Sequence, residues 1–74
     1  MTWYHGSDKE ITKLRQGSWV TNHKPIAKTF GKYLYIIDIP EESVDLDILY
    51  SAVENTSELR GTILKEALVK KVLS

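Results

Sequence analysis

The sequence predicts one small α+β domain over residues 1–74, with a mixed sheet and one or two short helices. Three observations carry this prediction. Several short β-prone segments end at clusters of turn-forming residues, and one segment with helical spacing lies between a proline and a glycine. The composition, with 42% hydrophobic and 27% charged residues, is that of an ordinary globular protein. A chain of 74 residues lies near the lower limit for folding without disulfides or metal.

The first two expected elements are a strand and a helical turn. Residues 2–5 are aromatic and β-prone and end at a cluster of turn formers, which predicts a short first strand that places His5 at its end. Ser7 is followed three residues later by Glu10, a spacing typical of a capping box. We therefore expect one helical turn after the strand, which buries Ile11 and Leu14.

A second strand and a helix follow. Residues 17–21 are a second strand candidate. Thr21 or Asn22 can cap a helix that has Pro25 in its first turn. Apolar residues at i, i+1 and i+4 place one face of that helix toward the core, and we expect it to end near Phe30.

The strongest strand signal lies in the middle of the chain. Gly31 is expected to stop the preceding helix in a left-handed conformation. Residues 32–39 are apolar on both alternating faces, which predicts a central strand, and Pro40 ends it. Residues 44–46 can form a brief strand, and residues 48–53 have the spacing of a short helix.

The C-terminal part of the chain is ambiguous. Residues 55–57 are expected to form a loop. From residue 62 to residue 73 the apolar positions suit a helix, whereas residues 62–64 and 69–73 taken separately suit two short strands. Local propensity favours the helix, and both alternatives stay open.

Composition excludes several classes of function. Ten basic and ten acidic residues cancel, and the basic ones are spread along the chain, so a broad nucleic-acid-binding surface is not expected. With no cysteine and two histidines, the chain offers neither a disulfide framework nor a metal site. No apolar run reaches the roughly 20 residues that cross a bilayer. We therefore expect a soluble, cytoplasmic domain without membrane contact.

Four short motifs follow one another along the chain, and their order is informative. They are Tyr4-His5-Gly6-Ser7, Gly17-Ser18-Trp19-Val20-Thr21, a helix that ends at Phe30, and Tyr33-Leu34-Tyr35-Ile36. This series resembles the start of the ADP-ribosyltransferase superfamily, in its histidine-tyrosine-glutamate branch. In that branch a Tyr-His-Gly-Ser/Thr strand end precedes a Gly-x-aromatic-x-Thr/Ala strand and a helix with a second aromatic residue. The resemblance covers about residues 3–39.

The resemblance implies a site for NAD. A flat, amide-bearing nicotinamide ring needs a backbone donor and acceptor and an aromatic face. By the resemblance, Gly6 supplies the backbone pair, since a Cβ there would obstruct the ligand, and His5 hydrogen-bonds the adjoining ribose hydroxyl. Phe30 is the stacking face and Trp19 walls the pocket. Thr21, which ends the second motif, completes the predicted binding residues.

The chain departs from the family pattern in two places. Phe30 replaces the usual tyrosine, which keeps the stacking face and removes a hydroxyl. The catalytic glutamate of the branch should fall near Gly61 or Thr62, where no acid is present; Glu58 and Glu66 are the nearest carboxylates. That glutamate stabilises the positive charge that develops as the glycosidic bond breaks. The catalytic residues are therefore unknown, and catalysis is expected to be weak or absent.

Three hypotheses about function follow. The first is a minimal ADP-ribosyltransferase-like domain that binds NAD or a related ADP-ribose nucleotide, and that, if active, transfers ADP-ribose to a macromolecule such as a target protein. The second is a catalytically inactive protein-interaction module or inhibitor, of the kind that phages and mobile elements encode. The third is an unrelated small α+β domain that matches Tyr-His-Gly-Ser by chance. Core packing is the alternative role for Trp19 and Phe30. A C-terminal strand that carries Glu58 or Glu66 toward His5 would favour the enzyme.

Overall fold

The protein is described by a computed structural model that covers residues 1–47 and 58–73. The helix expected at 48–53 and the loop expected at 55–57 lie outside the described residues. In chain order the elements are β1 Thr2–Ser7, β2 Lys13–Leu14, β3 Trp19–Thr21, α1 Lys24–Lys28, β4 Tyr33–Asp38, the 3-10 turn η1 Glu41–Ser43, β5 Val44–Leu46, β6 Arg60–Ile63, β7 Ala67–Leu68 and β8 Lys71–Leu73.

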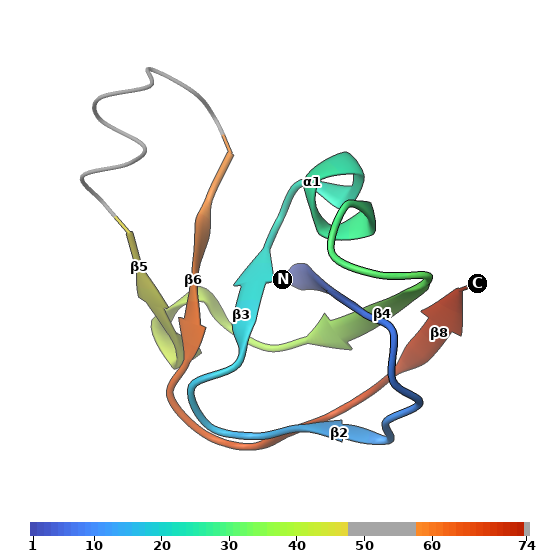
Figure 1. Ribbon diagram of the computed structural model, residues 1–74. Coiled ribbons are helices and arrows are strands. Elements are labelled where there is room, and N and C mark those ends of the chain that lie inside the picture. Colours follow the sequence, from blue (N-terminus) through green and yellow to red (C-terminus); the bar gives the residue numbers. More distant parts are fainter. Residues whose placement is uncertain (48–57, 74) are drawn as a thin grey trace.

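Strands dominate this small domain. Six of them form one sheet in the order β5-β6-β3-β1-β4-β8, and β2 pairs with β7 in a separate ribbon (Figure 1). All pairings between the described strands are antiparallel, so the expectation of a mixed sheet is wrong. β3 and β4, which run in the same direction, lie on either side of β1. The connection from β3 through α1 to β4 therefore crosses over β1, and β3 and β4 are not neighbours in the sheet.

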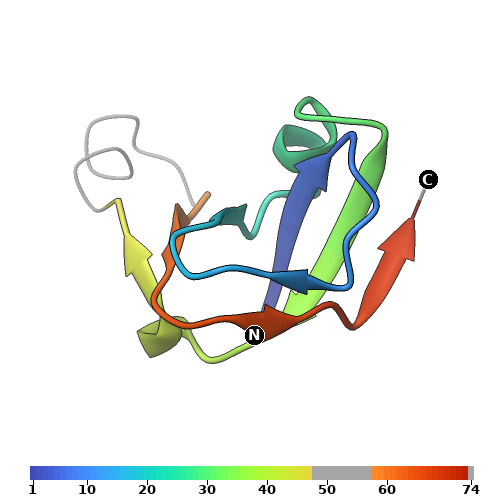
Figure 2. The same cartoon turned by 60° about the horizontal axis from the view of Figure 1, so that its bottom comes forward.

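Different elements pack against the two faces of the sheet. Successive strand residues point to opposite faces, so Trp3 and Gly6 of β1 lie on different sides. The β2–β7 ribbon crosses the face that carries Trp3 (Figure 2), and α1 covers the other face. The main core fills the ribbon side and consists of Trp3, Leu14, Val20, Ile37, Val44, Ile63 and Ala67.

Gly6 is the point at which α1 approaches β1. A Cβ at Gly6 would lie 1.9 Å from the Ala27 carbonyl oxygen and 3.2 Å from the Phe30 Cβ. Glycine is therefore required here by the packing of the helix against the strand. The resemblance implied that a ligand requires glycine here, and the approach of α1 to β1 requires it on its own.

The segment after β1 is a turn and not the expected helical turn. The Ser7 hydroxyl accepts the Lys9 amide at 3.1 Å, two residues away, so no capping box forms. The Tyr35 hydroxyl donates to the Lys9 carbonyl and accepts the Ile11 amide at 3.0 Å. Leu14 is buried as expected. The Tyr35 hydroxyl, which comes from β4, therefore holds this segment in place of the hydrogen bonds of a helical turn.

Tyr35→Phe is expected to lower the free energy of unfolding by about 1–3 kcal/mol, because two backbone groups lose a buried partner. The matched control is Tyr33→Phe. The Tyr33 hydroxyl donates to the exposed Glu10 carboxylate at 3.1 Å, a bond that raises the pKa of this phenol. Urea unfolding should place the Tyr33 variant within about 0.5 kcal/mol of wild type. Equal losses in both variants would contradict the bridging role of Tyr35.

Two further expectations are corrected. β4 is an interior strand, paired with β1 and with the edge strand β8, but β3 and β1 form the middle of the sheet. Gly31 does not adopt a left-handed conformation, since Gly17 is the glycine with positive φ in the described chain. A Cβ at Gly31 would lie 2.2 Å from the Ser7 carbonyl carbon, so close backbone approach explains this glycine.

The tail forms strands where local propensity favoured a helix. β6 pairs with both β3 and β5, β7 pairs with β2, and β8 pairs with β4. Each strand is too short to be stable alone, and pairing with distant segments decides the outcome. Helical structure in the described residues is confined to the five residues of α1 and to η1. Neither has the length and apolar character that crossing a membrane requires.

Candidate functional site

The sheet is split beside His5. β1 pairs with β4 along its whole length, from Thr2 to Ser7. Its pairing with β3 consists of Tyr4 opposite Thr21, after which the two described strands diverge. The His5 ring spans the gap, because its Nδ1 lies 2.7 Å from the Trp19 carbonyl oxygen. A side-chain hydrogen bond thus takes the place of the backbone ladder at the split.

This hydrogen bond determines which nitrogen of His5 can serve a ligand. A carbonyl oxygen only accepts, so Nδ1 must be the protonated, donating nitrogen. In the neutral ring Nε2 is then an acceptor. An acceptor nitrogen that lies in a pocket is suited to a ligand hydroxyl, and this is the role that the resemblance implies for His5.

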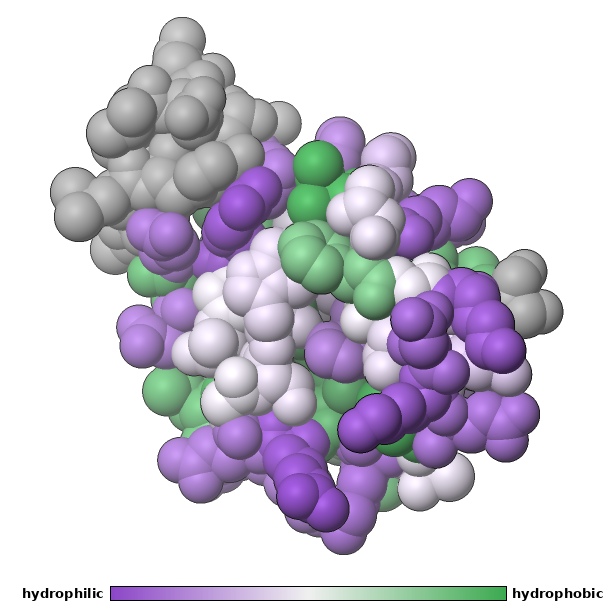
Figure 3. Space-filling model, in the orientation of Figure 1, coloured by the Kyte–Doolittle hydropathy of each residue, from purple (hydrophilic) through white to green (hydrophobic). Residues whose placement is uncertain are grey.

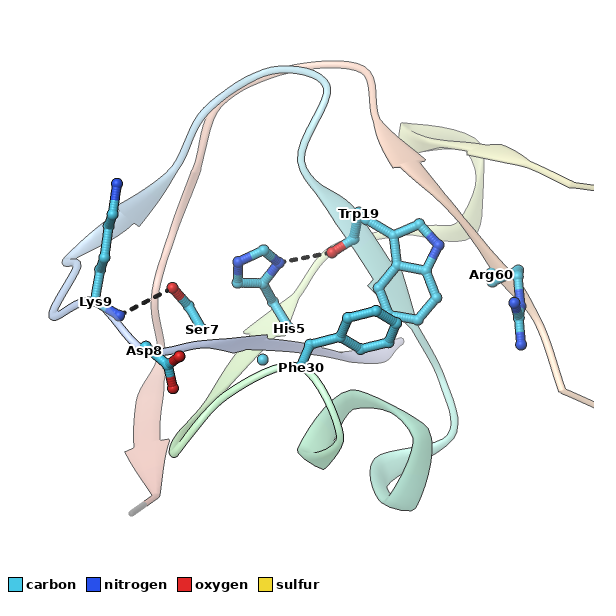
Figure 4. A pocket seen from close by; sticks show the side chains of 8 residues that line it. His5, Ser7, Asp8, Lys9, Trp19, Phe30 and Arg60 are labelled. Carbon is cyan, nitrogen blue, oxygen red and sulfur yellow. Dashed lines mark hydrogen bonds between the residues drawn. The ribbon is translucent and has the colours of Figure 1, made fainter.

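A pocket of about 530 Å³ opens at the split. That volume lies within the range of about 300–1,000 Å³ typical of small-molecule sites. In Figure 4 His5 lies above β1 and the Phe30 ring lies beside the Trp19 ring, with Trp19 on the adjoining strand and Arg60 beyond Trp19. The lining residues are His5, Gly6, Ser7, Asp8, Lys9, Trp19, Phe30 and Arg60.

Two aromatic side chains form one wall of this pocket. The ring centroids of Trp19 and Phe30 are 4.8 Å apart, and the rings are tilted by 50°. Phe30 is 55% exposed, although the helical pattern predicted it on the buried face. An aromatic residue that is more than half exposed adds little to the core. Its exposure is consistent with a ring that contacts a ligand.

Thr21, unlike the other four predicted residues, does not line the pocket. It is fully buried at the end of β3. Its hydroxyl donates to the Leu59 carbonyl at 2.8 Å and accepts the His23 amide at 3.1 Å. Thr21 therefore joins β3 to the chain before β6 and to the start of α1. It supports the site without facing it.

Arg60 lines the pocket and was missed by sequence reasoning. It is the first residue of β6, opposite Thr21, and its guanidinium carbon lies 5.6 Å from the centre of the Trp19 ring. Arg60 Nε donates to Glu58 Oε2 at 2.8 Å and Nη2 donates to Glu58 Oε1 at 3.2 Å. The sequence offered one signal for Arg60, namely its position: it directly precedes Gly61 and Thr62, where the catalytic glutamate was expected.

Neither candidate glutamate is carried into this pocket. The Glu58 side chain is 6% exposed, and its carboxylate faces Arg60 and the Thr21 hydroxyl. Glu66 lies between β6 and β7 and pairs with Lys13 at 3.3 Å. The tail does form strands, as the enzyme hypothesis required, but the residue that β6 turns toward the pocket is a cation.

A second groove, of about 340 Å³, adjoins the pocket and shares His5, Ser7 and Lys9 with it. Lys9, Lys13 and Arg15 make its lining basic. A groove of this kind suits phosphate groups, which bind to Lys and Arg side chains. The pocket and the groove together offer an aromatic wall at one end and a cationic lining at the other.

Comparisons with protein-family models, with curated proteins and with solved structures found no significant match to this chain.

Proposed function

We propose that this domain binds NAD or a related ADP-ribose nucleotide in the pocket beside His5, and that its sheet is of the ADP-ribosyltransferase-like kind. One observation carries the proposal. His5, Gly6, Trp19 and Phe30 come from three separate segments, were nominated from motif order alone, and line one pocket. A chance motif match gives no reason for these segments to converge.

The chemistry of the pocket fits the parts of such a ligand. Trp19 and Phe30 offer aromatic surface to a planar ring, and the backbone of Gly6 lies in the lining. Nε2 of His5 would accept a ribose hydroxyl, given that Nδ1 is committed to Trp19. The adjoining groove would receive the diphosphate through Lys9 and Arg15. Every named part of the ligand thus has a partner of suitable chemistry.

We confine the proposal to binding. Transfer of ADP-ribose to a macromolecule is the reaction that the resemblance implies, and it calls for a carboxylate beside the breaking bond. Of the described residues that line the pocket, Asp8 is the acidic one, and its Oδ1 accepts the Lys32 amide at 2.9 Å. We propose the cytoplasm as the setting, because a cysteine-free chain suits a reducing compartment.

Amide-resolved NMR titration with NAD tests this proposal. Wild type should show saturable shifts centred on His5, Gly6, Trp19 and Phe30. His5→Ala should lose these shifts or need at least about tenfold more NAD, which is the loss expected for one hydrogen bond of about 1.4 kcal/mol. Silence of the wild-type spectrum at millimolar NAD would eliminate a nucleotide site.

The matched control for His5 is His23→Ala. His23 precedes α1 and is not among the residues lining the pocket. Its replacement should leave the NAD titration unchanged. If both histidine variants lose binding equally, the loss reflects damage to the fold and the assignment of His5 fails.

A second candidate function is an inactive protein-interaction module. The cation at Arg60, where an acid was sought, favours a domain that has no transfer chemistry. On the face seen in Figure 3, however, hydrophobic residues form several small, separate areas among hydrophilic ones. A stoichiometric protein partner whose binding is unaffected by NAD and by His5→Ala would favour this second function over the first.

A further inference from the structure

The six-stranded sheet ends in two edge strands of opposite charge. β5 and β8 lie on opposite sides of the molecule, and no strand of the described residues pairs with the outer side of either (Figures 1 and 2). Asp45 is the middle residue of β5, and Lys71 is the first residue of β8. Both side chains are exposed, and neither forms an ion pair with another described residue. An open edge strand is a template for pairing with another chain.

The outer backbone groups of β5 belong to its two apolar residues. The Asp47 amide donates to the Arg60 carbonyl at 2.8 Å, across the pair that β5 forms with β6. Successive residues of an antiparallel strand direct their backbone groups to opposite sides. Asp47 faces β6, so Val44 and Leu46 direct their amides and carbonyls toward the open edge.

The same alternation assigns the outer residue of β8. The Ile39 amide donates to the Met1 carbonyl at 3.1 Å, so the odd-numbered residues that precede it on β4 face β1. Ile36 therefore faces β8, where its partner is Lys71. Val72 follows Lys71 and directs its backbone groups to the open edge. Its side chain is 51% exposed.

The two valines of these edges lie on the same face of the sheet. Val44 belongs to the main core on the face that carries Trp3. Val72 is opposite Tyr35, and Tyr35 is opposite His5, which is two residues from Trp3 on β1. Residues opposite each other share a face, as do residues two apart on one strand. Each edge thus presents a valine on this face and a charged neighbour on the other.

We propose that the outer edge of β8 docks against the outer edge of β5 of a second copy of this chain, which extends the sheet head to tail. The six strands alternate in direction, so β5 and β8 run oppositely and a translated copy continues the antiparallel order. With Val44 opposite Val72, both residues direct their backbone groups into the new joint, and Asp45 lies opposite Lys71. Opposite charges at facing positions stabilise a strand pair.

The charge pattern favours this partner over a symmetric one. Pairing of β8 with β8, or of β5 with β5, would gather like charges along one joint. Pairing of β5 with β8 joins an acid to a base, and the formal net charge of zero means that whole copies do not repel one another. A contact between two different edges does not close on itself, so the assembly grows as an open chain of copies.

This contact would bring a residue of the second copy next to the candidate site. Asp45 lines a groove of about 260 Å³ together with Trp19 and Arg60, and both of these also line the pocket beside His5. Docking places Lys71 of the second copy at this groove. The inference does not depend on nucleotide binding, because it rests on the edge strands alone.

The association should be weak and reversible. Each edge strand has three residues, so the contact buries far less than the roughly 1,200 Å² of a stable complex. We expect a dissociation constant of about 1 mM. As the protein concentration rises from about 0.05 to about 1 mM, the NMR shifts of β5 and β8 amides should move together and translational diffusion should slow.

Charge reversal tests the pairing of Asp45 with Lys71. Asp45→Lys and Lys71→Asp should each remove the dependence on concentration, because each places like charges at the joint. The double variant carries both substitutions, keeps the net charge of the wild type and should recover the association. The matched control is Lys65→Asp: Lys65 is exposed between β6 and β7 and belongs to neither edge strand, so this variant should associate like wild type.

The pattern of results decides the inference. Shifts at both edges that vanish in the two single variants and return in the double variant support it. It is overturned if wild-type spectra do not change up to about 1 mM, if the shifts are confined to one edge, or if the single variants associate like wild type. Should a single variant fail to fold, salt gives the answer. Association that about 0.5 M salt leaves undiminished would overturn the charge pairing, and a clear weakening would support it.

Discussion

Gly6→Ala is expected to cost about 3 kcal/mol of folding free energy or more, the upper end of what overpacking a core costs. The added Cβ would lie 1.9 Å from the Ala27 carbonyl oxygen. That obstacle is backbone, which cannot rotate away as a side chain would, so α1 has to move off β1. For a domain of this size, such a loss corresponds to a fall in melting temperature of about 12–24 °C. Thermal and urea unfolding of the variant measure both quantities.

Gly17→Ala is the control for this substitution. Gly17 has a φ of 87°, and an added Cβ would have no heavy atom within 4 Å, so alanine there suffers backbone strain without a collision. Its cost should be about 1 kcal/mol. A folded, stable Gly6→Ala variant that has lost nucleotide binding alone would show that the glycine serves the ligand and not the helix, contrary to the packing observed here.

Arg60→Met is expected to destabilise the fold by about 2–3 kcal/mol. The substitution leaves the Glu58 carboxylate buried without its bidentate partner, and uncompensated burial of a charge costs about 3–5 kcal/mol in a fully enclosed site. The Arg60 side chain is 25% exposed, so water relieves part of that penalty. Urea unfolding at neutral pH gives the difference directly.

A double-mutant cycle separates loss of the ion pair from loss of packing. Glu58→Met combined with Arg60→Met removes both charges and should recover at least about 1 kcal/mol relative to Arg60→Met alone. If the effects of the two substitutions on the free energy of unfolding are additive, Glu58 and Arg60 have no coupling energy. In that case the carboxylate does not hold the guanidinium against Trp19.

The first forty residues were more predictable than the last fifteen, for a physical reason. β1, β3 and β4 are marked by aromatic and β-branched runs between turn formers, and α1 by Pro25, so local signals agree with the fold. The tail has apolar residues at spacings that suit either a helix or two short strands. Pairing with β2, β3, β4 and β5 makes it extended, and pairing with distant strands leaves no trace in a local window.

The site was predictable in part. His5, Gly6, Trp19 and Phe30 could be nominated because motif order is visible in a sequence. Arg60 could not, since its place in the pocket depends on the register of β6 against β3 and on the split beside His5. Thr21 was nominated as part of a motif, but burial between β3 and the chain before β6 gives its hydroxyl backbone partners instead.

The pocket takes its lining from both halves of the chain, with His5 and Gly6 on β1 and Arg60 on β6. A ligand there would bind only chains in which the C-terminal strands have joined the N-terminal ones. At one hundred times its dissociation constant, a ligand adds about 2.7 kcal/mol to folding stability. Any ligand of this pocket would therefore also act as a fastener between the two ends of the chain, and resistance to proteolysis would rise with its concentration.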